Sequence, residues 1–269
     1  MSYKDMYKSL GLKTELNRLE AQVKVGWDKE LRSLKLLGLN DNSRILEIGS
    51  GPGFVTQRLL DAFPRSNIIC LEIDEVMLTI AKKRLAHYGN TRLAIIKGNV
   101  TNMSIKDNSF DFVVVRLVFQ HLEDPIAASN EIFRVLKPGG TVIITDIDSG
   151  IWGISDPEVK SVNNAIKKLT NMQNEGGGDR NIGRKLLKIL RNSGFVDLDF
   201  EAVVKHSDME GMDSLIPKID LDSIVKSNNF NKEQLKGLLS MYDNISGSKE
   251  SVIILILLMA SGTKPYNKH

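Results

Sequence analysis

Residues Ile45 to Phe54, with the sequence ILEIGSGPGF, decide how this chain folds. The segment opens with an apolar run typical of a buried strand and then meets Gly49, Gly51 and Gly53, each separated by one residue. Apolar residues at helical spacing follow directly, at Val55, Leu59, Leu60 and Phe63. Strand, glycine loop and helix in this order predict the first half of a βαβ unit. Glycines suit such a loop because a ligand can approach bare backbone, and the N–H groups at the helix start then face that ligand.

The spacing of the glycines separates two classes of ligand. A dinucleotide-binding loop reads G-x-G-x-x-G, and its third glycine lets the helix pack closely on the strand. Here Phe54 occupies that place and the third glycine comes one residue early. A nicotinamide-dependent oxidoreductase therefore remains an alternative, but the loop does not have its spacing.

The composition is that of a globular α/β protein. The 269 residues are enough for one domain with a cap or for two small domains, and contents of 42% hydrophobic and 26% charged residues are ordinary. The formal net charge is only +3, and Lys and Arg form no dense run. We therefore expect no nucleic-acid partner.

Three features bear on the compartment. The single cysteine, Cys70, lies in an apolar strand pattern and cannot form an intramolecular disulfide, which suits a reducing environment. The first ten residues, MSYKDMYKSL, lack the apolar core of a signal peptide. The apolar run from Val252 to Ala260 is far shorter than the roughly 20 residues of a spanning helix and predicts a buried strand. We expect a cytoplasmic protein with no membrane partner.

The N-terminal segment predicts a helical lid over residues 1–40. Apolar residues recur at helical spacing from Thr14 to Leu37, in one long helix or in two that break near Gly26. Arg18 and Gln22 are four residues apart and share a helix face. This face is either simply solvated or presents its polar side chains to the carboxylate of a ligand.

Residues 41–269 predict a Rossmann-like, doubly wound α/β domain, because strand and helix patterns alternate. The second strand ends in Glu72, whose carboxylate could accept both hydroxyls of a ribose, one on each oxygen. Asp74 and Asp124 are expected N-caps of the helices that follow them. The further strands of the sheet are expected at 67–72, 91–97, 110–115 and 141–147.

Four ordered motifs carry a resemblance to a known family. They are LEIGSGPG at 46–53, CLEID at 70–74, GNV at 98–100 and RVLKPGG at 134–140. In these features residues 44–148 resemble the class I S-adenosylmethionine-dependent methyltransferases of small molecules, the group that includes the quinone methyltransferases. The resemblance implies S-adenosylmethionine as cofactor, and a terminal strand pair at 195–205 and 251–261 whose last strand is antiparallel.

The resemblance also implies which residues contact the cofactor. Gly49 and Gly51 would flank the methionine moiety, Glu72 would bind the ribose, and Ile73 and Val100 would bracket the adenine. The remaining contacts would come from Glu47, Ser50, Asn99 and Arg116, with Arg18 and Gln22 from the lid. Relatives often have Asp at position 99, and Asn99 can still accept from the adenine amino group, but without the charge.

The acceptor is expected to be a small molecule that is methylated at O, N or C. The N/D-P-P-Y motif of several amino-methylating enzymes is absent after the fourth strand, where the chain reads Arg116-Leu117-Val118-Phe119. His121, in the same loop, is the best candidate for a general base, and a structural histidine is the alternative. His206 and Asp146 are weaker candidates. No metal is expected, because Asp146 and Asp148 at a strand end are more simply caps or exposed groups.

Two segments are expected to cap the acceptor, at 151–180 and 207–250. The first would be a helix opened by Asp156-Pro157-Glu158, and the second would contain helical pieces around Asp220–Val225 and Lys232–Tyr242. A binding module with this fold but without turnover is the remaining alternative to an enzyme.

Overall fold

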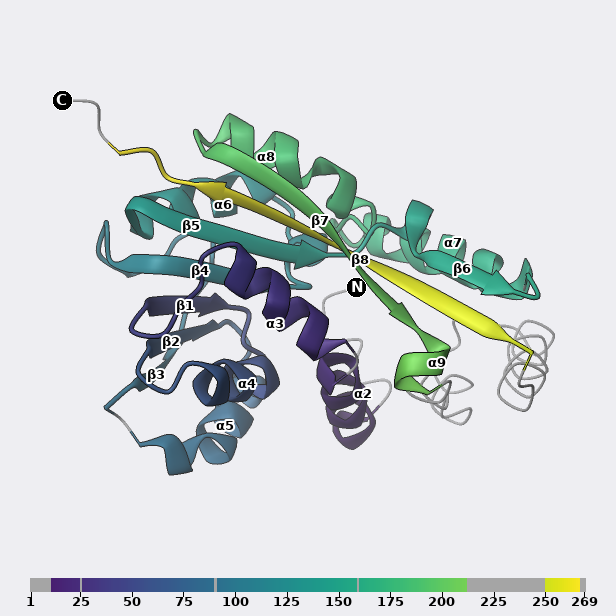
Figure 1. Cartoon of the computed structure of the whole chain (residues 1–269), viewed down its shortest axis with the longest axis horizontal. Coiled ribbons are helices and arrows are strands. Elements are labelled where there is room, and N and C mark those ends of the chain that lie inside the picture. Colours follow the sequence, from purple (N-terminus) through teal and green to yellow (C-terminus); the bar gives the residue numbers. More distant parts are fainter. Residues whose placement is uncertain (1–10, 25, 90, 159, 212–249, 267–269) are drawn as a thin grey trace.

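A mixed sheet runs through the molecule, and helices cover both of its faces (Figure 1). This computed structural model describes residues 11–24, 26–89, 91–158, 160–211 and 250–266. The strand order is β3-β2-β1-β4-β5-β8-β6, with β7 paired to β8 as well. The strands are β1 (Arg44–Ile48), β2 (Asn67–Glu72), β3 (Leu93–Lys97), β4 (Phe110–Arg116), β5 (Leu136–Asp146), β6 (Gly153–Asp156), β7 (Val196–His206) and β8 (Val252–Thr263).

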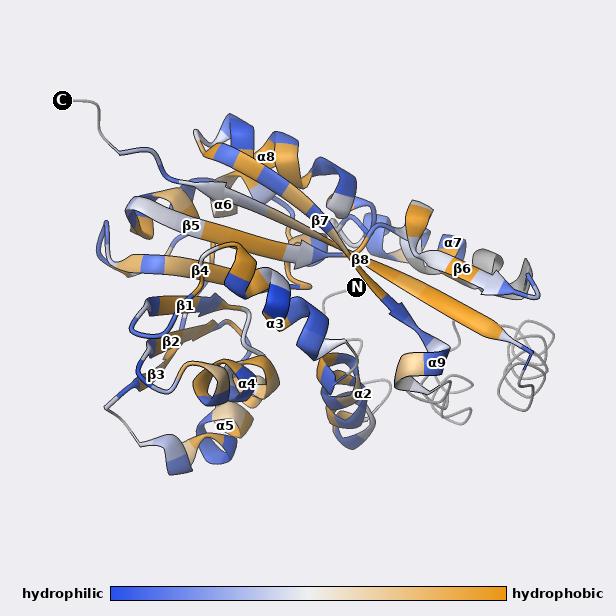
Figure 2. Cartoon of the chain, in the orientation of Figure 1, coloured by the Kyte–Doolittle hydropathy of each residue, from blue (hydrophilic) through white to orange (hydrophobic). Residues whose placement is uncertain are grey.

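The expected Rossmann-like architecture is confirmed. Strands β1 to β5 pair in parallel, and β8 runs antiparallel to its neighbours β5, β6 and β7. Figure 2 shows β8 as apolar over much of its length, as the run from Val252 to Ala260 predicts. Parallel strands that end on one edge place the loops after β1, β2, β4 and β5 together, which is where such sheets bind ligands.

Alternating side chains of the central strands fill two separate cores. Val113 and Val115 of β4 point into the core beneath α6 and α8, whereas Phe112 and Val114 point into the core beneath α2, α3 and α4. Successive side chains of a strand face opposite ways, so a strand that is covered on both sides has to be apolar throughout. This explains why FDFVVV at 110–115 carries so little polar character.

The helices begin and end largely where capping residues predict. The longer ones are α2 (Leu12–Lys24), α3 (Trp27–Leu36), α4 (Phe54–Ala62), α5 (Glu75–Arg84), α6 (Pro125–Val135), α7 (Lys160–Glu175) and α8 (Leu186–Asn192). Asp74 accepts from the amides of Val76 and Met77, and Asp124 accepts from the amide of Ala127. The N-terminal segment forms two helices and breaks at Gly26, whose φ of 73° is left-handed.

Two local expectations are wrong. Asp156 does not open a helix but ends strand β6, which pairs with β8, and helix α7 begins only at Lys160. The motif Lys137-Pro138-Gly139-Gly140 does not precede β5 but lies inside it, where the pairing with β4 shifts between Phe110 and Phe112. The proline has no N–H to give to a ladder and Gly139 has a φ of 79°, so this part of the strand bulges.

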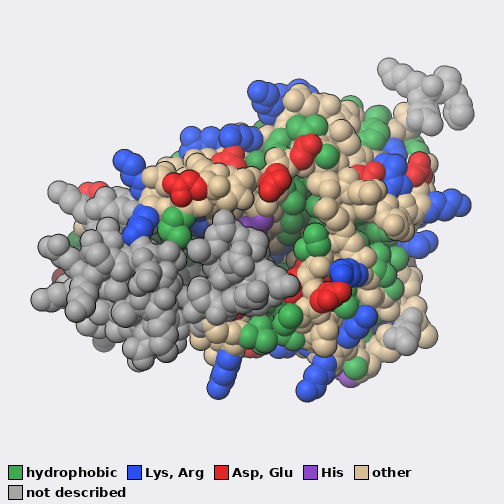
Figure 3. Space-filling model, turned by 180° about the vertical axis from the view of Figure 1, so that it is seen from behind, with side chains coloured by type: hydrophobic (Ala, Val, Ile, Leu, Met, Phe, Trp, Pro, Cys, Tyr) green, Lys and Arg blue, Asp and Glu red, His purple; other side chains and the backbone are tan. Residues whose placement is uncertain are grey.

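The proposed cap segments are only partly described. Residues 151–180 contain β6 and α7, whereas 212–249 lie outside the described residues, and with them both expected helical pieces, Asp220–Val225 and Lys232–Tyr242. Among the residues that are described, no helix is long and apolar enough to cross a membrane. Figure 3 shows acidic and basic side chains interspersed over one face of the molecule.

Candidate functional site

The glycine loop after β1 has both tightly packed and open positions. A Cβ on Gly49 would lie 2.4 Å from Cγ2 of Val118, so this glycine is required by packing against the loop after β4. A Cβ on Gly51 would meet no heavy atom within 4 Å, although its φ of 54° is left-handed. The space above Gly51 is therefore open, as the approach of a ligand to bare backbone requires. Ser50 lies buried between the two glycines.

Glu72 ends β2 beside this open space. Its Oε2 accepts from the Gly51 amide at 2.7 Å, and its Oε1 accepts from the Asp74 amide at 2.8 Å. Burial raises the pKa of the carboxyl group, and the amides of Asp74 and Gly51 oppose that shift. Each carboxylate oxygen has a second lone pair, so both could still accept a hydroxyl of a ribose. The neighbouring Ile73 is 61% exposed and could lie against a flat apolar ring.

The loop after β3 contains the expected adenine contacts. Asn99 is exposed, and its Oδ1 accepts from the Thr101 amide at 3.0 Å, which leaves one lone pair of that oxygen for a ligand. Val100 is only 6% exposed and packs into the core beneath α6 and α8. The structure thus offers Ile73, more than Val100, as an accessible apolar surface.

Glu47 lies underneath the glycine loop, not in it. Its side chain is 4% exposed and forms a 2.6 Å hydrogen bond with Oγ1 of Thr56, on the first turn of α4. Burial raises the pKa of this carboxyl group to about 8, and the charge of Glu72 adds to the effect. Glu47 is therefore largely protonated at neutral pH, and its hydrogen bond with Thr56 joins β1 to the first turn of α4.

We expect Glu47 to make the free energy of unfolding fall as the pH rises. At pH values between the ordinary pKa of 4.5 and about 8, the folded state keeps a proton that the unfolded state has lost. Stability then falls with rising pH over this window, by roughly 2–5 kcal/mol in total. Urea unfolding of wild type and Glu47→Gln between pH 4.5 and 8 measures this loss of stability. As the pH rises, the free energy of unfolding of the variant should increase relative to that of wild type. Parallel curves would mean that Glu47 is ionised in the folded protein.

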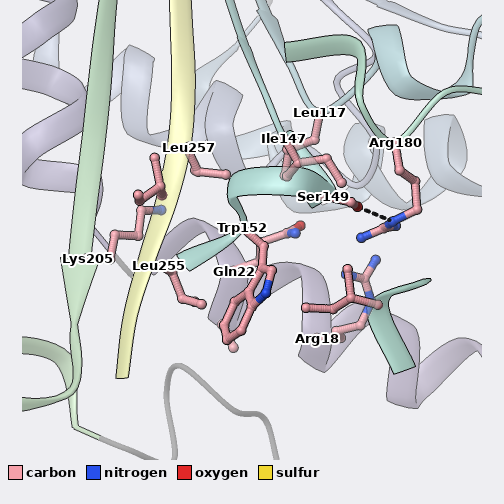
Figure 4. Close-up of a pocket in the computed structure, with 13 residues that line it drawn as sticks. Arg18, Gln22, Leu117, Ile147, Ser149, Trp152, Arg180, Lys205, Leu255 and Leu257 are labelled. Carbon is pink, nitrogen blue, oxygen red and sulfur yellow. Dashed lines mark hydrogen bonds between the residues drawn. The ribbon is translucent and has the colours of Figure 1, made fainter. Parts of the chain in front are cut away.

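A cavity of about 310 Å³ opens at the same edge of the sheet, over the ends of β4 and β5 (Figure 4). Its walls come from α2, from the segments that follow β4 and β5, from α7, and from β7 and β8. Most of the lining is aliphatic or aromatic, and the exceptions include Arg18, Gln22, Ser149, Arg180 and Lys205. An apolar pocket with a few polar groups is the usual form of a small-molecule site.

The N-terminal helix contributes two of the predicted residues to this cavity. Arg18 and Gln22 both line it, so the face they share on α2 is turned toward the cavity. Arg18 also binds Glu15 at 2.6 and 2.7 Å. Their expected contact with the cofactor stays a prediction.

Arg116 has a different set of partners from those expected of a cofactor ligand. Its Nε and Nη2 donate to Glu30 of α3 at 2.7 and 2.9 Å, and Nη2 also donates to the carbonyl oxygen of Gln22. Lys205 of β7 binds the same Glu30 at 2.9 Å. This buried ion-pair cluster of Glu30, Arg116 and Lys205 ties the N-terminal helices to the sheet. A role of Arg116 toward the cofactor would therefore be indirect.

His121 lies in the short 3-10 turn Phe119–His121 after β4 and, like His206, is not among the residues that line the cavity. Its Nδ1 is 3.3 Å from Nε2 of Gln173, and that nitrogen also donates to the carbonyl oxygen of Gln120 at 2.6 Å. Burial is the main cause that lowers the pKa of the imidazole to about 4, and the charges of Arg180 and Arg18 act in the same direction. The ring is therefore neutral at neutral pH, although its edge remains accessible to solvent.

Asp146, the last residue of β5, and Asp148 both bind groups of the protein itself. Asp146 is fully buried and accepts from the amides of Ile147 and Gln120, which joins the ends of β5 and β4. Burial raises the pKa of Asp146 to about 7, against the pull of these amides. Asp148 caps the next turn and binds Arg184. No group of three His, Cys, Asp or Glu side chains is placed to hold a metal within the described part of the chain.

Several lining residues could not be predicted from the sequence, because they belong to segments without a motif. Trp152 and Ser149 follow β5, Arg180 follows α7, and Lys205, Leu255 and Leu257 come from β7 and β8. His206, a weaker candidate, ends β7 but is not among the residues that line the cavity. A hint was available at Lys205, a cation that directly follows the apolar run Ala202-Val203-Val204 near the end of β7.

Comparisons with known proteins agree with this geometry. The methyltransferase domain family matches residues 46–144. A ubiquinone/menaquinone biosynthesis C-methyltransferase of Wigglesworthia glossinidia brevipalpis is 31% identical over 115 residues, which are 42% of this chain and 46% of that protein. Phosphoethanolamine N-methyltransferase 2 of Caenorhabditis elegans is 28% identical over 177 residues, 65% of this chain and 38% of that protein. The matches thus span less than half the length of these curated relatives.

Solved structures show the same fold. Phosphoethanolamine N-methyltransferase 2 of Haemonchus contortus, in complex with phosphomonomethylethanolamine and S-adenosylhomocysteine, has a TM-score of 0.60 at 21% identity and covers 90% of this chain and 54% of its own. Three observations indicate a methyltransferase domain: the order of the strands, the glycine loop with Glu72 beside it, and the family match. Residues 46–144 thus match the methyltransferase domain family, and over this part the chain is similar to a ubiquinone/menaquinone C-methyltransferase.

Proposed function

We propose that this chain transfers a methyl group from S-adenosylmethionine to a small-molecule acceptor. The observation that carries the proposal is the contact between the Gly51 amide and Glu72 at the edge of the sheet onto which the 310 Å³ cavity also opens. One site would hold a nucleoside and the other an acceptor. The curated relatives named above methylate at carbon and at nitrogen, so the atom that is methylated here stays open.

The cofactor would lie along the loops after β1, β2 and β3. Gly49, Ser50 and Gly51 would border the methionine part, with Glu47 as a support beneath them. Glu72 would accept the ribose hydroxyls, and Ile73, Asn99 and Val100 would contact the adenine. When bound, S-adenosylmethionine supplies an electrophilic methyl group on a sulfonium. Arg18 and Gln22 of α2 would close the site from the side of the acceptor.

The chain itself would contribute mainly alignment. Holding two reactants in line can be worth roughly 7–11 kcal/mol of the barrier, and a methyl transfer needs a base only when the acceptor must lose a proton. The apolar walls of the cavity, Trp152 and Leu257 among them, would exclude water around the acceptor. His121 is neutral at neutral pH and is our candidate for the proton acceptor.

We expect His121→Gln to lower turnover roughly 10²- to 10⁴-fold while the affinity for S-adenosylhomocysteine stays within about twofold of wild type. Steady-state rates with the identified acceptor and calorimetric titration with S-adenosylhomocysteine measure the two quantities. His87→Gln is the matched control, because it removes an exposed histidine in the turn after α5 and should keep the turnover of wild type. Full turnover in His121→Gln would show that His121 is not the proton acceptor.

The proposed function has a direct test. Titration calorimetry with S-adenosylmethionine and S-adenosylhomocysteine should show binding of both to the folded chain. Incubation with a donor labelled in its methyl group and a cell metabolite extract should then transfer label to a small molecule. Absence of heat with either ligand would overturn the proposal. Binding without transfer would leave a module that binds the cofactor without turnover.

We include in the proposal the division into a lid over 1–40 and a domain over 41–269 with cap segments at 151–180 and 207–250. The lid is supported by the predicted residues Arg18 and Gln22, which α2 adds to the cavity, and the first cap by Trp152 and Ile166.

The proposal also includes a cytoplasmic location. The single thiol, Cys70, is buried and its pKa is raised well above the usual value by burial, which suits a reducing cytoplasm. Neither a nucleic acid nor a membrane is part of the proposal.

A further inference from the structure

We propose that the acceptor carries an anionic group, a carboxylate or a phosphate, on an apolar body, and that Arg180 binds this group. The inference rests on the proposed function, because it assigns the 310 Å³ cavity to the acceptor. It goes further by naming the chemical class of the acceptor and the residue that selects it.

Among the described residues, neutral side chains alone hold Arg180 in place. Its Nε donates to Oγ of Ser149 at 3.2 Å, and its Nη1 donates to Oε1 of Gln173 at 3.3 Å (Figure 4). No carboxylate of the described residues lies within 4.0 Å of the guanidinium, and its Nη2 donates to none of their acceptors. A half-buried, oriented guanidinium without a counter-ion is a ready site for an anion, because its planar fork matches carboxylate and phosphate oxygens.

Asp146, the acid whose charge acts on Arg180, does not neutralise it. Asp146 attracts it, but both Asp146 oxygens accept from backbone amides. The pKa of Asp146 is raised to about 7 by burial, so it carries only part of a charge at neutral pH. Burial lowers the pKa of Arg180, as expected of a cation that has lost water and, among the described residues, forms hydrogen bonds with neutral groups alone.

The other two cations of the cavity add positive potential. The guanidinium of Arg18 lies toward that of Arg180 (Figure 4), and the like charge of Arg18 lowers the pKa of Arg180. Arg18 also pairs with Glu15, which offsets part of its field. Lys205 is a third cation in the lining and shares Glu30 with Arg116. An anion between the arginines would therefore meet cations on more than one side.

The rest of the lining argues against a small, wholly polar acceptor. Apolar side chains surround the cations, namely Leu117, Ile147, Trp152, Ile166, Leu255 and Leu257. A ligand without apolar surface would leave these side chains in contact with water and forgo their burial. An acceptor with an anionic group at one end and an aliphatic or aromatic body at the other fits both the cationic and the apolar part of the lining.

Three probes of equal chain length test the proposal: octanoate, octyl phosphate and octan-1-ol. Each is titrated calorimetrically into the full chain at neutral pH with saturating S-adenosylhomocysteine. We expect wild type to bind at least one anion about tenfold or more tightly than the alcohol, and the tighter of the two identifies carboxylate or phosphate. In Arg180→Gln the affinities for the anion and for octan-1-ol should differ by no more than about threefold. Arg191→Gln removes an exposed charge on α8 and should keep the preference of wild type for the anion.

The outcomes separate this inference from the proposed function. Equal binding of the alcohol and both anions by wild type would overturn the inference, as would full anion preference in folded Arg180→Gln. Arg180→Lys serves if the glutamine variant does not fold, and it should keep the preference for anions but bind them more weakly than wild type. If S-adenosylhomocysteine itself fails to bind wild type, the proposed function falls. If it binds normally and the preference is absent, only the anionic acceptor is lost.

Discussion

Glu30→Ala is expected to lower the free energy of unfolding by about 3–5 kcal/mol, the cost of removing one partner from a buried ion pair. Glu30 is 2% exposed and receives Arg116 at 2.7 Å and Lys205 at 2.9 Å. The variant would remove the carboxylate that both buried cations bind, and taking the anion from a buried ion pair is among the most costly changes in a protein. Urea unfolding followed by circular dichroism at neutral pH measures the loss.

Two comparisons show whether burial and sharing cause the effect. Glu20→Ala removes an acid of α2 whose pair with Lys24 is exposed, and should cost at most about 0.5 kcal/mol. Lys205→Met leaves Glu30 and Arg116 as a balanced pair, so it should cost less than Glu30→Ala. A loss below about 1 kcal/mol in Glu30→Ala would mean that water reaches the cluster and replaces the acid.

The same cluster gives the stability a pH dependence at the acid end. Burial raises the pKa of Glu30, but the charges and hydrogen bonds of Arg116 and Lys205 outweigh it, and the pKa lies below the ordinary 4.5. This contribution is present above pH 4.5 and is lost as the pH falls through the folded-state value. Wild type and Glu30→Ala should therefore approach each other in stability as the solution is acidified below that value.

The fold could be predicted because its signals are local. The strands are apolar runs bounded by caps or glycines, and the cap at Asp74 and the break at Gly26 depend on one or two residues each. The expectations that failed, β6 and the start of β5, depend on pairing with distant partners. The short segment Gly153–Asp156 becomes a strand because β8 extends beyond its pairing with β5. The first residues of β8 pair with this segment, and the last ones pair with β5.

The candidate site divides in the same way. Gly51 and Glu72 were predictable because both lie at fixed places within one βαβ unit. Arg180 could not be, since its place in the cavity depends on contacts with Ser149 and Gln173 from other segments. The partner of Arg116 could not be predicted either. Arg116 ends β4 on the same face as Val114, beneath the N-terminal helices, and only the fold brings Glu30 of α3 to this position.

Glu72→Ala is expected to weaken the binding of S-adenosylhomocysteine roughly 10²- to 10⁴-fold. Two hydrogen bonds to the charged carboxylate would be lost, each worth about 1.5–3 kcal/mol, and tenfold in affinity corresponds to about 1.4 kcal/mol. The variant also removes the acceptor of the Gly51 and Asp74 amides, so the glycine loop would lose an anchor.

Comparison with Glu72→Asp and Glu75→Ala assigns the effect to this carboxylate. Glu72→Asp keeps the charge on a shorter side chain and should lose less affinity than Glu72→Ala. Glu75 is an exposed acid on the first turn of α5 that pairs with Lys97, and its replacement by Ala should change the affinity by less than about threefold. Wild-type affinity in both Glu72 variants would place the ribose elsewhere. In the proposed site, Glu72 differs from Glu75 in forming direct hydrogen bonds to the ribose. An equal loss of affinity in Glu75→Ala would therefore mean that the negative potential at this edge of the sheet, and not these hydrogen bonds, causes the effect.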